Sequence, residues 1–144
     1  NTIRKRVSYE QLLSGYGLEQ IYQALTNAKS IKGDNEKTPK LSAEEICKKG
    51  INKNCQLSYQ ALSIFCRVLG SFAGNIALIM NSQGGFYIAG GIVPRFIDFL
   101  KSSDFRERFE SKGRLSNITK QTPTYIITEA QPGLLGAAGF LLQQ

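Results

Sequence analysis

The residues best suited to bind a ligand lie in the run Gly84-Gly85-Phe86-Tyr87-Ile88-Ala89-Gly90-Gly91-Ile92-Val93-Pro94. Aromatic and β-branched residues at its centre predict a strand over 86–89 that ends at two glycines. A ligand can approach the backbone of Gly90 and Gly91 closely because neither has a side chain. A helix predicted to begin near Pro94 would point its first amide groups toward the same place. The pattern is typical of a nucleotide-binding turn, and it also fits a tight strand-to-helix connection without a ligand.

Glu10 is the second candidate for binding chemistry. Ser8 predicts the N-cap of a short helix over 9–13, which would place Glu10 in the first turn, where the helix dipole favours an ionised carboxylate. Such a carboxylate can accept hydrogen bonds from two sugar hydroxyl groups in a fixed orientation. The alternative is an ordinary surface residue. The segment Ser14 to Gly17 predicts a turn between two helices, which either shapes a ligand wall or only redirects the chain.

Residue types that are absent or few exclude several kinds of chemistry. The chain has no histidine, which removes the commonest general base and the Ser-His and Cys-His nucleophile arrangements. Its three cysteines have no Cys-x-x-Cys spacing, so we expect reduced thiols rather than a disulfide or a zinc site. Any catalysis must therefore depend on carboxylates, backbone amides or residues from elsewhere.

Charge and hydropathy predict a soluble globular domain over residues 1–144. Eighteen basic and 11 acidic residues give a formal net charge of +7, but the two signs are interleaved as on a solvated surface. We therefore expect no nucleic-acid partner; a basic nucleic-acid module stays as an alternative, whose binding would fall steeply with salt. The longest apolar runs are far below the roughly 18 residues of a membrane span, and no signal peptide opens the chain.

Helices are expected to position the candidate residues. The spacing of Leu18, Ile21, Tyr22 and Leu25 predicts a helix over about 17–28, followed by a polar surface loop over 29–41. From Gln56 a wide apolar face continues for some 25 residues and predicts a central buried helix, too short and too interrupted to span a membrane. Further elements are expected at 43–49 (a helix with a Ser42/Glu45 capping box), 94–101, 103–111 and 134–142 (helices), and 124–128 (a strand).

The count of strands suggests that the sheet is incomplete. Only two strands are predicted, and a two-stranded sheet is marginal alone, so we expect it to be completed by other sequence or by another subunit. The only methionine is Met80, so we also expect the chain to be part of something longer. The order of helices and strands predicts an α/β fold with helices packed on the sheet.

Three segments together resemble one family. They are Val7 to Leu18 (VSYEQLLSGYGL), Gly84 to Phe96 (GGFYIAGGIVPRF) and Gln131 to Ala138 (QPGLLGAA). In order and spacing they are similar to the C-terminal half of bacterial glucokinases, over nearly all of this chain. The resemblance implies the sugar kinase, Hsp70 and actin superfamily, in which two ribonuclease H-like lobes close over ATP and the acceptor. This chain would be the C-terminal segment of the large lobe, without the N-terminal lobe.

The same resemblance implies that the full protein phosphorylates glucose at its 6-hydroxyl, with ATP and Mg²⁺. Glu10 corresponds to the family glutamate that binds the sugar hydroxyls, and Gly90, Gly91 and Ile92 correspond to the adenosine motif. The helix from Pro132 corresponds to a segment that connects the lobes. A cytoplasmic homodimer is implied as well.

The chain also departs from the family pattern. It lacks the family's phosphate loop, its Asn-Asp catalytic pair, its Glu-Gly-Gly-His sugar motif and its Gly-Thr-Gly hairpin, all of which precede this segment in the family. The general-base aspartate would therefore lie upstream, and we expect this chain alone to be inactive. A non-catalytic sugar-binding regulator with a kinase-like fold remains the alternative function.

Overall fold

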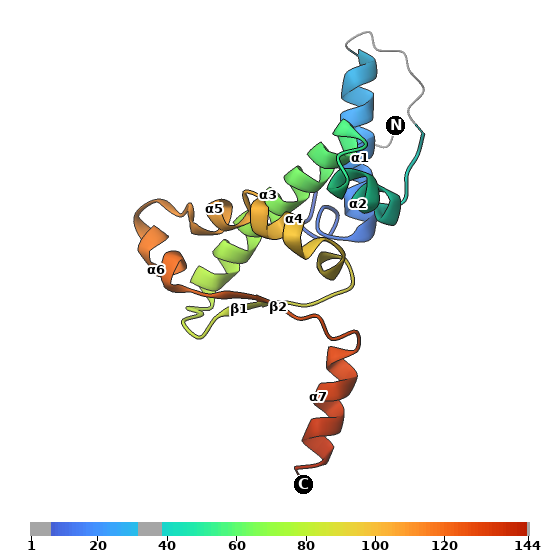
Figure 1. Ribbon diagram of the computed structural model, residues 1–144. Coiled ribbons are helices and arrows are strands. Elements are labelled where there is room, and N and C mark those ends of the chain that lie inside the picture. The colour runs from blue at the N-terminus through green and yellow to red at the C-terminus, as the bar shows by residue number, and fades with distance from the viewer. Residues whose placement is uncertain (1–6, 32–38, 144) are drawn as a thin grey trace.

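A 24-residue helix, α3 (Gln56–Ile79), lies at the centre of the helical layer. The computed structural model describes residues 7–31 and 39–143, and in it α3 runs diagonally through the helical layer (Figure 1). It contacts α1 (Gly15–Ile31), α2 (Ala43–Ile51) and α5 (Phe105–Glu110). The prediction of a central buried helix is confirmed. Its buried apolar face consists of Leu57, Ala61, Leu62, Phe65, Cys66, Leu69, Ala73 and Ala77.

Two glycines allow α3 and α5 to pack with their backbones in contact. A Cβ atom on Gly70 would collide with the carbonyl oxygen of Phe105, and one on Gly74 would collide with that of Phe109. Both phenylalanine rings are buried in the core. Small residues one helical turn apart on α3 therefore fix how closely α5 approaches.

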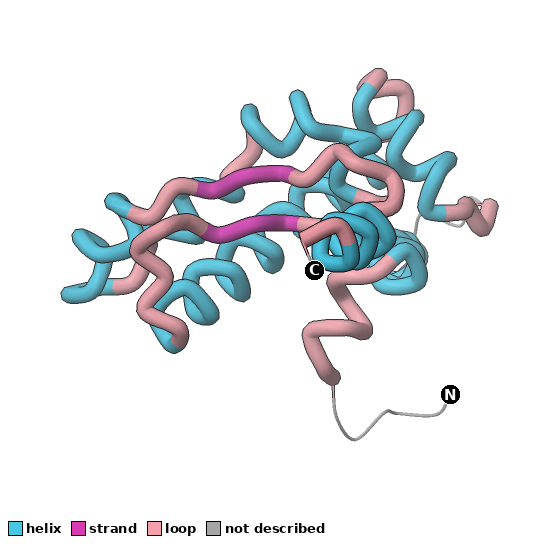
Figure 2. Tube along the Cα trace, turned by 90° about the horizontal axis from the view of Figure 1, so that it is seen from below, coloured by secondary structure: helices cyan, strands magenta, loops and turns pink. Residues whose placement is uncertain are grey.

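The sheet consists of two short parallel strands, β1 (Phe86–Ile88) and β2 (Thr124–Ile126), with Tyr87 paired to Tyr125. Figure 2 shows the strands side by side, with the helical layer behind them. Both were predicted, but each is shorter than expected, since β1 ends at Ile88 rather than at 89 and β2 at Ile126 rather than at 128. The Tyr87 and Tyr125 rings stack at 4.9 Å between centroids and are exposed. Two strands with one open face fit the expectation of an incomplete sheet.

The structure corrects the start of the chain. Residues 9–13 form a turn and not the expected helix, with the Leu13 amide donating to the Tyr9 carbonyl at 2.7 Å. The hydroxyl of Ser14, and not that of Ser8, accepts from a helix amide, that of Gly17, at 3.0 Å. The chain bends so tightly here that a Cβ on Gly17 would collide with the Leu12 carbonyl. The first helix thus begins at residue 15.

The expected loop over 29–41 is corrected at both ends. Helix α1 continues to Ile31, and Leu41 is buried in the core. Residues 32–38 lie outside the described residues. The capping box before α2 is confirmed: the Ser42 amide donates to Glu45 Oε2 at 2.9 Å, and the Glu45 amide donates to Ser42 Oγ at 3.3 Å.

The segment between the strands contains more helix than the sequence predicts. The expected helix at 94–101 is a 3₁₀ turn, η1 (Val93–Phe96), followed by α4 (Ile97–Ser102), and α5 lies within the predicted 103–111. After it come a second 3₁₀ turn, η2 (Gly113–Leu115), and α6 (Ser116–Gln121), neither of which was predicted. Their sequence is mostly polar and lacks apolar spacing.

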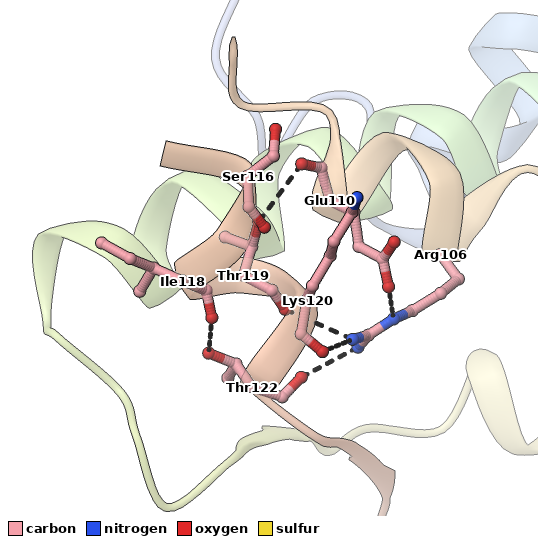
Figure 3. A network of polar contacts seen from close by, with 7 residues as sticks. All are labelled: Arg106, Glu110, Ser116, Ile118, Thr119, Lys120 and Thr122. Carbon is pink, nitrogen blue, oxygen red and sulfur yellow. Dashed lines mark hydrogen bonds and ion pairs between the residues drawn. The ribbon is translucent and has the colours of Figure 1, made fainter. Parts of the chain in front are cut away.

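Helix α6 is fastened to α5 by one arginine, Arg106 (Figure 3). Its guanidinium donates to three carbonyl oxygens at the end of α6: Thr119 at 3.2 Å, Lys120 at 3.0 Å and Thr122 at 2.9 Å. It also pairs with Glu110 and lies 5.0 Å from the centroid of the Phe109 ring. Because β2 begins two residues after Thr122, Arg106 also fixes where that strand starts.

The last helix, α7 (Pro132–Leu141), extends away from the rest of the chain (Figure 1). It was predicted, but none of its residues is buried, although it has no charged side chain. Its large apolar residues are 63–70% exposed: Leu134, Leu135, Phe140 and Leu141. An apolar helix without cover is a surface that a further part of a protein would have to bury.

The prediction that the central helix is too short and too interrupted to cross a membrane is wrong. Helix α3 has 24 residues and a mean hydropathy of 1.7 in its most apolar window, so it is long and apolar enough to cross a membrane. It nevertheless packs against α1, α2 and α5, with Leu62, Phe65 and Cys66 almost fully buried. The central helix of a globular domain meets the same test of length and composition.

Candidate functional site

The candidate nucleotide turn lies where both strands end. Because β1 and β2 are parallel, their carboxyl ends share one edge of the sheet, the usual position of a ligand in an open α/β fold. Gly90 has φ +125°, a conformation that L side chains rarely adopt. Cβ atoms placed on Gly90 and Gly91 would meet nothing within 4 Å. The backbone of this turn is therefore open to an approaching group, as the sequence predicts.

The helix expected at Pro94 does not present a regular N-terminus to the turn. Val93–Phe96 is a 3₁₀ turn, in which the Arg95 amide already donates to the Ile92 carbonyl at 3.1 Å. The α-helix that follows begins only at Ile97 and has six residues. The macrodipole of so short a helix is small, so the expected contribution of its amides to anion binding is not supported.

Arg95 holds the turn in place, and sequence reasoning missed it. Its Nε donates to the Gly91 carbonyl oxygen at 3.1 Å, and its Nη1 lies 3.6 Å from Glu44 Oε2 on α2. A hydrogen bond from Lys48, the Lys48 charge and the Arg95 charge lower the pKa of Glu44, which stays ionised. The four-residue spacing from Gly91 to Arg95 is the signal that could have identified this contact.

The start of helix α1 lies beside the candidate nucleotide turn. A Cβ placed on Gly15 would lie 4.0 Å from Cδ1 of Ile92 and 3.7 Å from Cβ of Ala43. This closeness is compatible with both interpretations of Ser14 to Gly17, a ligand wall and a simple change of direction. Two segments about 75 residues apart in sequence are thus brought together.

Glu10 lies in the turn over residues 9–13, the N-terminal turn, and its side chain is exposed. Because residues 9–13 are not helical, the expected stabilisation of its carboxylate by a helix dipole does not apply. The preceding residue anchors the turn, since the ring of Tyr9 packs on that of Phe72 of α3 with 4.5 Å between centroids. Glu10 is therefore presented to solvent from a fixed backbone, which is compatible with a ligand contact. Its role remains a prediction.

Side chains that could ligate a metal are not clustered in the described residues. Among residues 7–31 and 39–143, no group of three or more His, Cys, Asp or Glu side chains lies close enough to hold a metal ion. The three cysteines are free thiols, as expected. Burial raises the pKa of the Cys66 thiol to about 12.

Comparison with known proteins covers the whole chain. The family model described as Glucokinase matches residues 1–144. The chain belongs to the glucokinase family. It is 63% identical over 142 residues to a glucokinase of Colwellia psychrerythraea, covering 99% of this chain and 43% of that relative. A glucokinase of Photorhabdus laumondii is 46% identical over 138 residues, covering 96% and 41%.

A solved structure agrees with the sequence comparison. The crystal structure of a glucokinase from an Antarctic psychrotroph is similar with a TM-score of 0.81 and 35% identity. The match covers 96% of this chain and 42% of that one. The chain thus spans about two fifths of the length of the glucokinases it matches. The helix-rich α/β fold is that of this family over the matched part.

Proposed function

We propose that the complete protein transfers a phosphoryl group from ATP to the 6-hydroxyl of glucose in the cytoplasm. The observation that supports this most directly is the family match over residues 1–144, at up to 63% identity to a protein named glucokinase. Mg²⁺ would accompany ATP.

This chain would contribute two binding elements. The Glu10 carboxylate accepts hydrogen bonds from two sugar hydroxyls and fixes the orientation of the ring. The turn at Gly90, Gly91 and Ile92 forms a wall for the adenosine, and the start of α1, five residues after Glu10, lies close to Ile92. Positioning of this kind supplies much of the rate of phosphoryl transfer.

The proton of the sugar hydroxyl would be taken by an aspartate outside this chain. The chain has no histidine, and its one carboxylate with a proposed site role, Glu10, is assigned to sugar binding. We therefore propose that the 144 residues alone do not turn over. Closure of two lobes would exclude water, so that transfer to glucose outcompetes hydrolysis of ATP.

The uncovered surfaces support a larger assembly. We propose that this chain is part of a ribonuclease H-like large lobe whose sheet is extended by strands of the same protein, with the N-terminal lobe as its partner. The exposed Tyr87 and Tyr125 face and the uncovered helix α7 are the surfaces that would then be buried. A homodimer, commonly found in this family, is part of the same proposal and would be measured by sedimentation.

Glucose kinetics of the complete protein test the assignment of Glu10. Glu10→Gln removes the charge but keeps the shape, so KM for glucose should rise by about tenfold or more because charge-assisted hydrogen bonds are lost. Glu107→Gln, which removes an exposed carboxylate from α5, is the matched control and should leave KM unchanged. An unchanged KM in Glu10→Gln would contradict the assignment. Glucose binding without ADP formation by the unaltered protein would support a sugar-binding regulator instead.

ATP kinetics test the assignment of the turn. Gly90→Ala forces a side chain into φ +125°, at a cost of about 1–3 kcal/mol, and should distort the turn and raise KM for ATP. Gly84→Ala is the control, since its Cβ would also meet nothing within 4 Å and its φ is not in the left-handed region. Equal effects of the two substitutions would contradict the assignment.

A further inference from the structure

A groove lined by residues of α3 and α5 has the composition of an anion site. It has a volume of about 420 Å³ and lies where α3, α5 and the N-terminal turn meet. Its apolar residues are Leu12, Ile64 and Val68. Its polar residues are Tyr9, Arg67, Ser71 and Arg108, and no acidic residue lines it.

Positive charges gather around Ser71 at one end of this groove. Arg67 lies one helical turn before Ser71 on α3, and Arg108 reaches the groove from α5. Lys112 Nζ donates to the Ser71 carbonyl oxygen at 2.9 Å. Burial, followed by the charge of Arg108, lowers the pKa of Lys112, which agrees with the closeness of the two cations.

Negative charge does not balance these cations. Arg67 Nε lies 3.8 Å from Asp104 Oδ2, a long ion pair between side chains that are about half exposed. Exposed pairs of this kind contribute little and are easily exchanged for a ligand. An anion entering the groove would thus gain more favourable charge than it displaces.

We propose that this groove binds a phosphomonoester with a small organic body. Two guanidinium groups can each offer two parallel donors to phosphate oxygens, and a dianion needs more than one cation to balance it. The apolar side of the groove and the Tyr9 ring provide a surface for the carbon body, which a bare inorganic ion would leave unused. The volume lies within the range of small-molecule pockets.

The proposal is separate from the catalytic site proposed above and does not rest on glucose phosphorylation. The groove involves neither Glu10 nor the turn at Gly90 to Ile92. Arg67 and Arg108 are both exposed, so their replacement by glutamine should leave the core intact.

Calorimetric titration of the complete protein with glucose 6-phosphate tests the proposal. The double variant Arg67→Gln/Arg108→Gln should bind at least tenfold more weakly at the groove, since two charge-assisted contacts are lost. Arg114→Gln removes an exposed arginine outside the groove and should change the affinity by less than about twofold. Inorganic phosphate should bind more weakly than glucose 6-phosphate but show the same order of variants.

Residue-resolved modification by phenylglyoxal, which reacts with arginine side chains, tests the site in the unaltered protein. Glucose 6-phosphate should protect Arg67 and Arg108 and leave Arg114 reactive, as measured by peptide mass spectrometry. Lack of protection would overturn the proposal even if the double variant failed to fold. Equal losses of affinity in the double variant and in Arg114→Gln would overturn it too, since they would indicate a general response to net charge. Loss of all binding in Glu10→Gln alone would assign the ligand to the sugar site instead.

Discussion

Replacement of Arg106 is expected to be the most destabilising single change to a charged residue in the described part of the chain. Its guanidinium donates to three carbonyl oxygens at the end of α6 and pairs with Glu110 (Figure 3). Hydrogen bonds to a charged group contribute about 1.5–3 kcal/mol each. The Arg106 side chain is 37% exposed, so in a variant without it water can reach some of the carbonyl groups that it now contacts. The summed contribution of the hydrogen bonds must therefore be discounted strongly.

We expect Arg106→Ala to lower the free energy of unfolding by about 2–3 kcal/mol. Glu110→Gln is the matched control, because it weakens the ion pair and leaves the three carbonyl contacts in place, at a cost below about 1 kcal/mol. Arg106→Lys keeps the charge but removes the planar guanidinium group. Its decrease in unfolding free energy should lie between those of Glu110→Gln and Arg106→Ala.

Urea unfolding of the chain, followed by far-ultraviolet circular dichroism, measures these values. Hydrogen exchange should show faster opening of α6 and of the β2 amides in Arg106→Ala. The reasoning would be refuted if Arg106→Ala cost no more than Glu110→Gln, because the carbonyl contacts would then contribute nothing measurable.

Three further predictions concern packing, ionisation and capping. Gly70→Ala should destabilise the chain by about 1–3 kcal/mol in urea unfolding, because its Cβ would collide with the Phe105 carbonyl, whereas Gly84→Ala should have little effect. Burial raises the pKa of the Cys66 thiol from 9.0 to about 12 in the folded chain. The stability that the neutral thiol contributes is therefore fully present below pH 9 and is lost as the pH rises from 9 to 12. Cys66→Ala should reduce this fall in the free energy of unfolding, measured by urea unfolding at each pH. Ser42→Ala should cost about 1 kcal/mol of unfolding free energy through the lost cap of α2.

Elements that depend on local sequence could be predicted. The box of Ser42 and Glu45 needs only residues three apart, and the structure contains both of its hydrogen bonds. The apolar periodicity of α3 and the β-branched character of the two strands are local signals of the same kind. By contrast, α6 has no apolar periodicity, and the carbonyl groups at its end accept hydrogen bonds from Arg106 on another helix.

The candidate site could be predicted in part. The glycines of the turn are visible in the sequence, and the structure places Gly90 at a positive φ with open space around it. The closeness of Gly15 to Ile92 depends on how distant segments fold, and the hydrogen bond from Arg95 to the Gly91 carbonyl depends on the direction of one side chain. The prediction of a helix around Glu10 was wrong. Ser8 and Ser14 are both plausible N-caps in the sequence, and in the structure the chain bends tightly at Gly17 and Ser14 is the residue that caps the helix.

Glucose-dependent ADP formation, measured for this 144-residue chain beside the complete protein, tests the central claim most directly. The account predicts ADP formation by the complete protein only, because the proposed base lies outside the chain. ADP formation by the chain alone would contradict the division of roles, and no formation by either protein would contradict the kinase function itself.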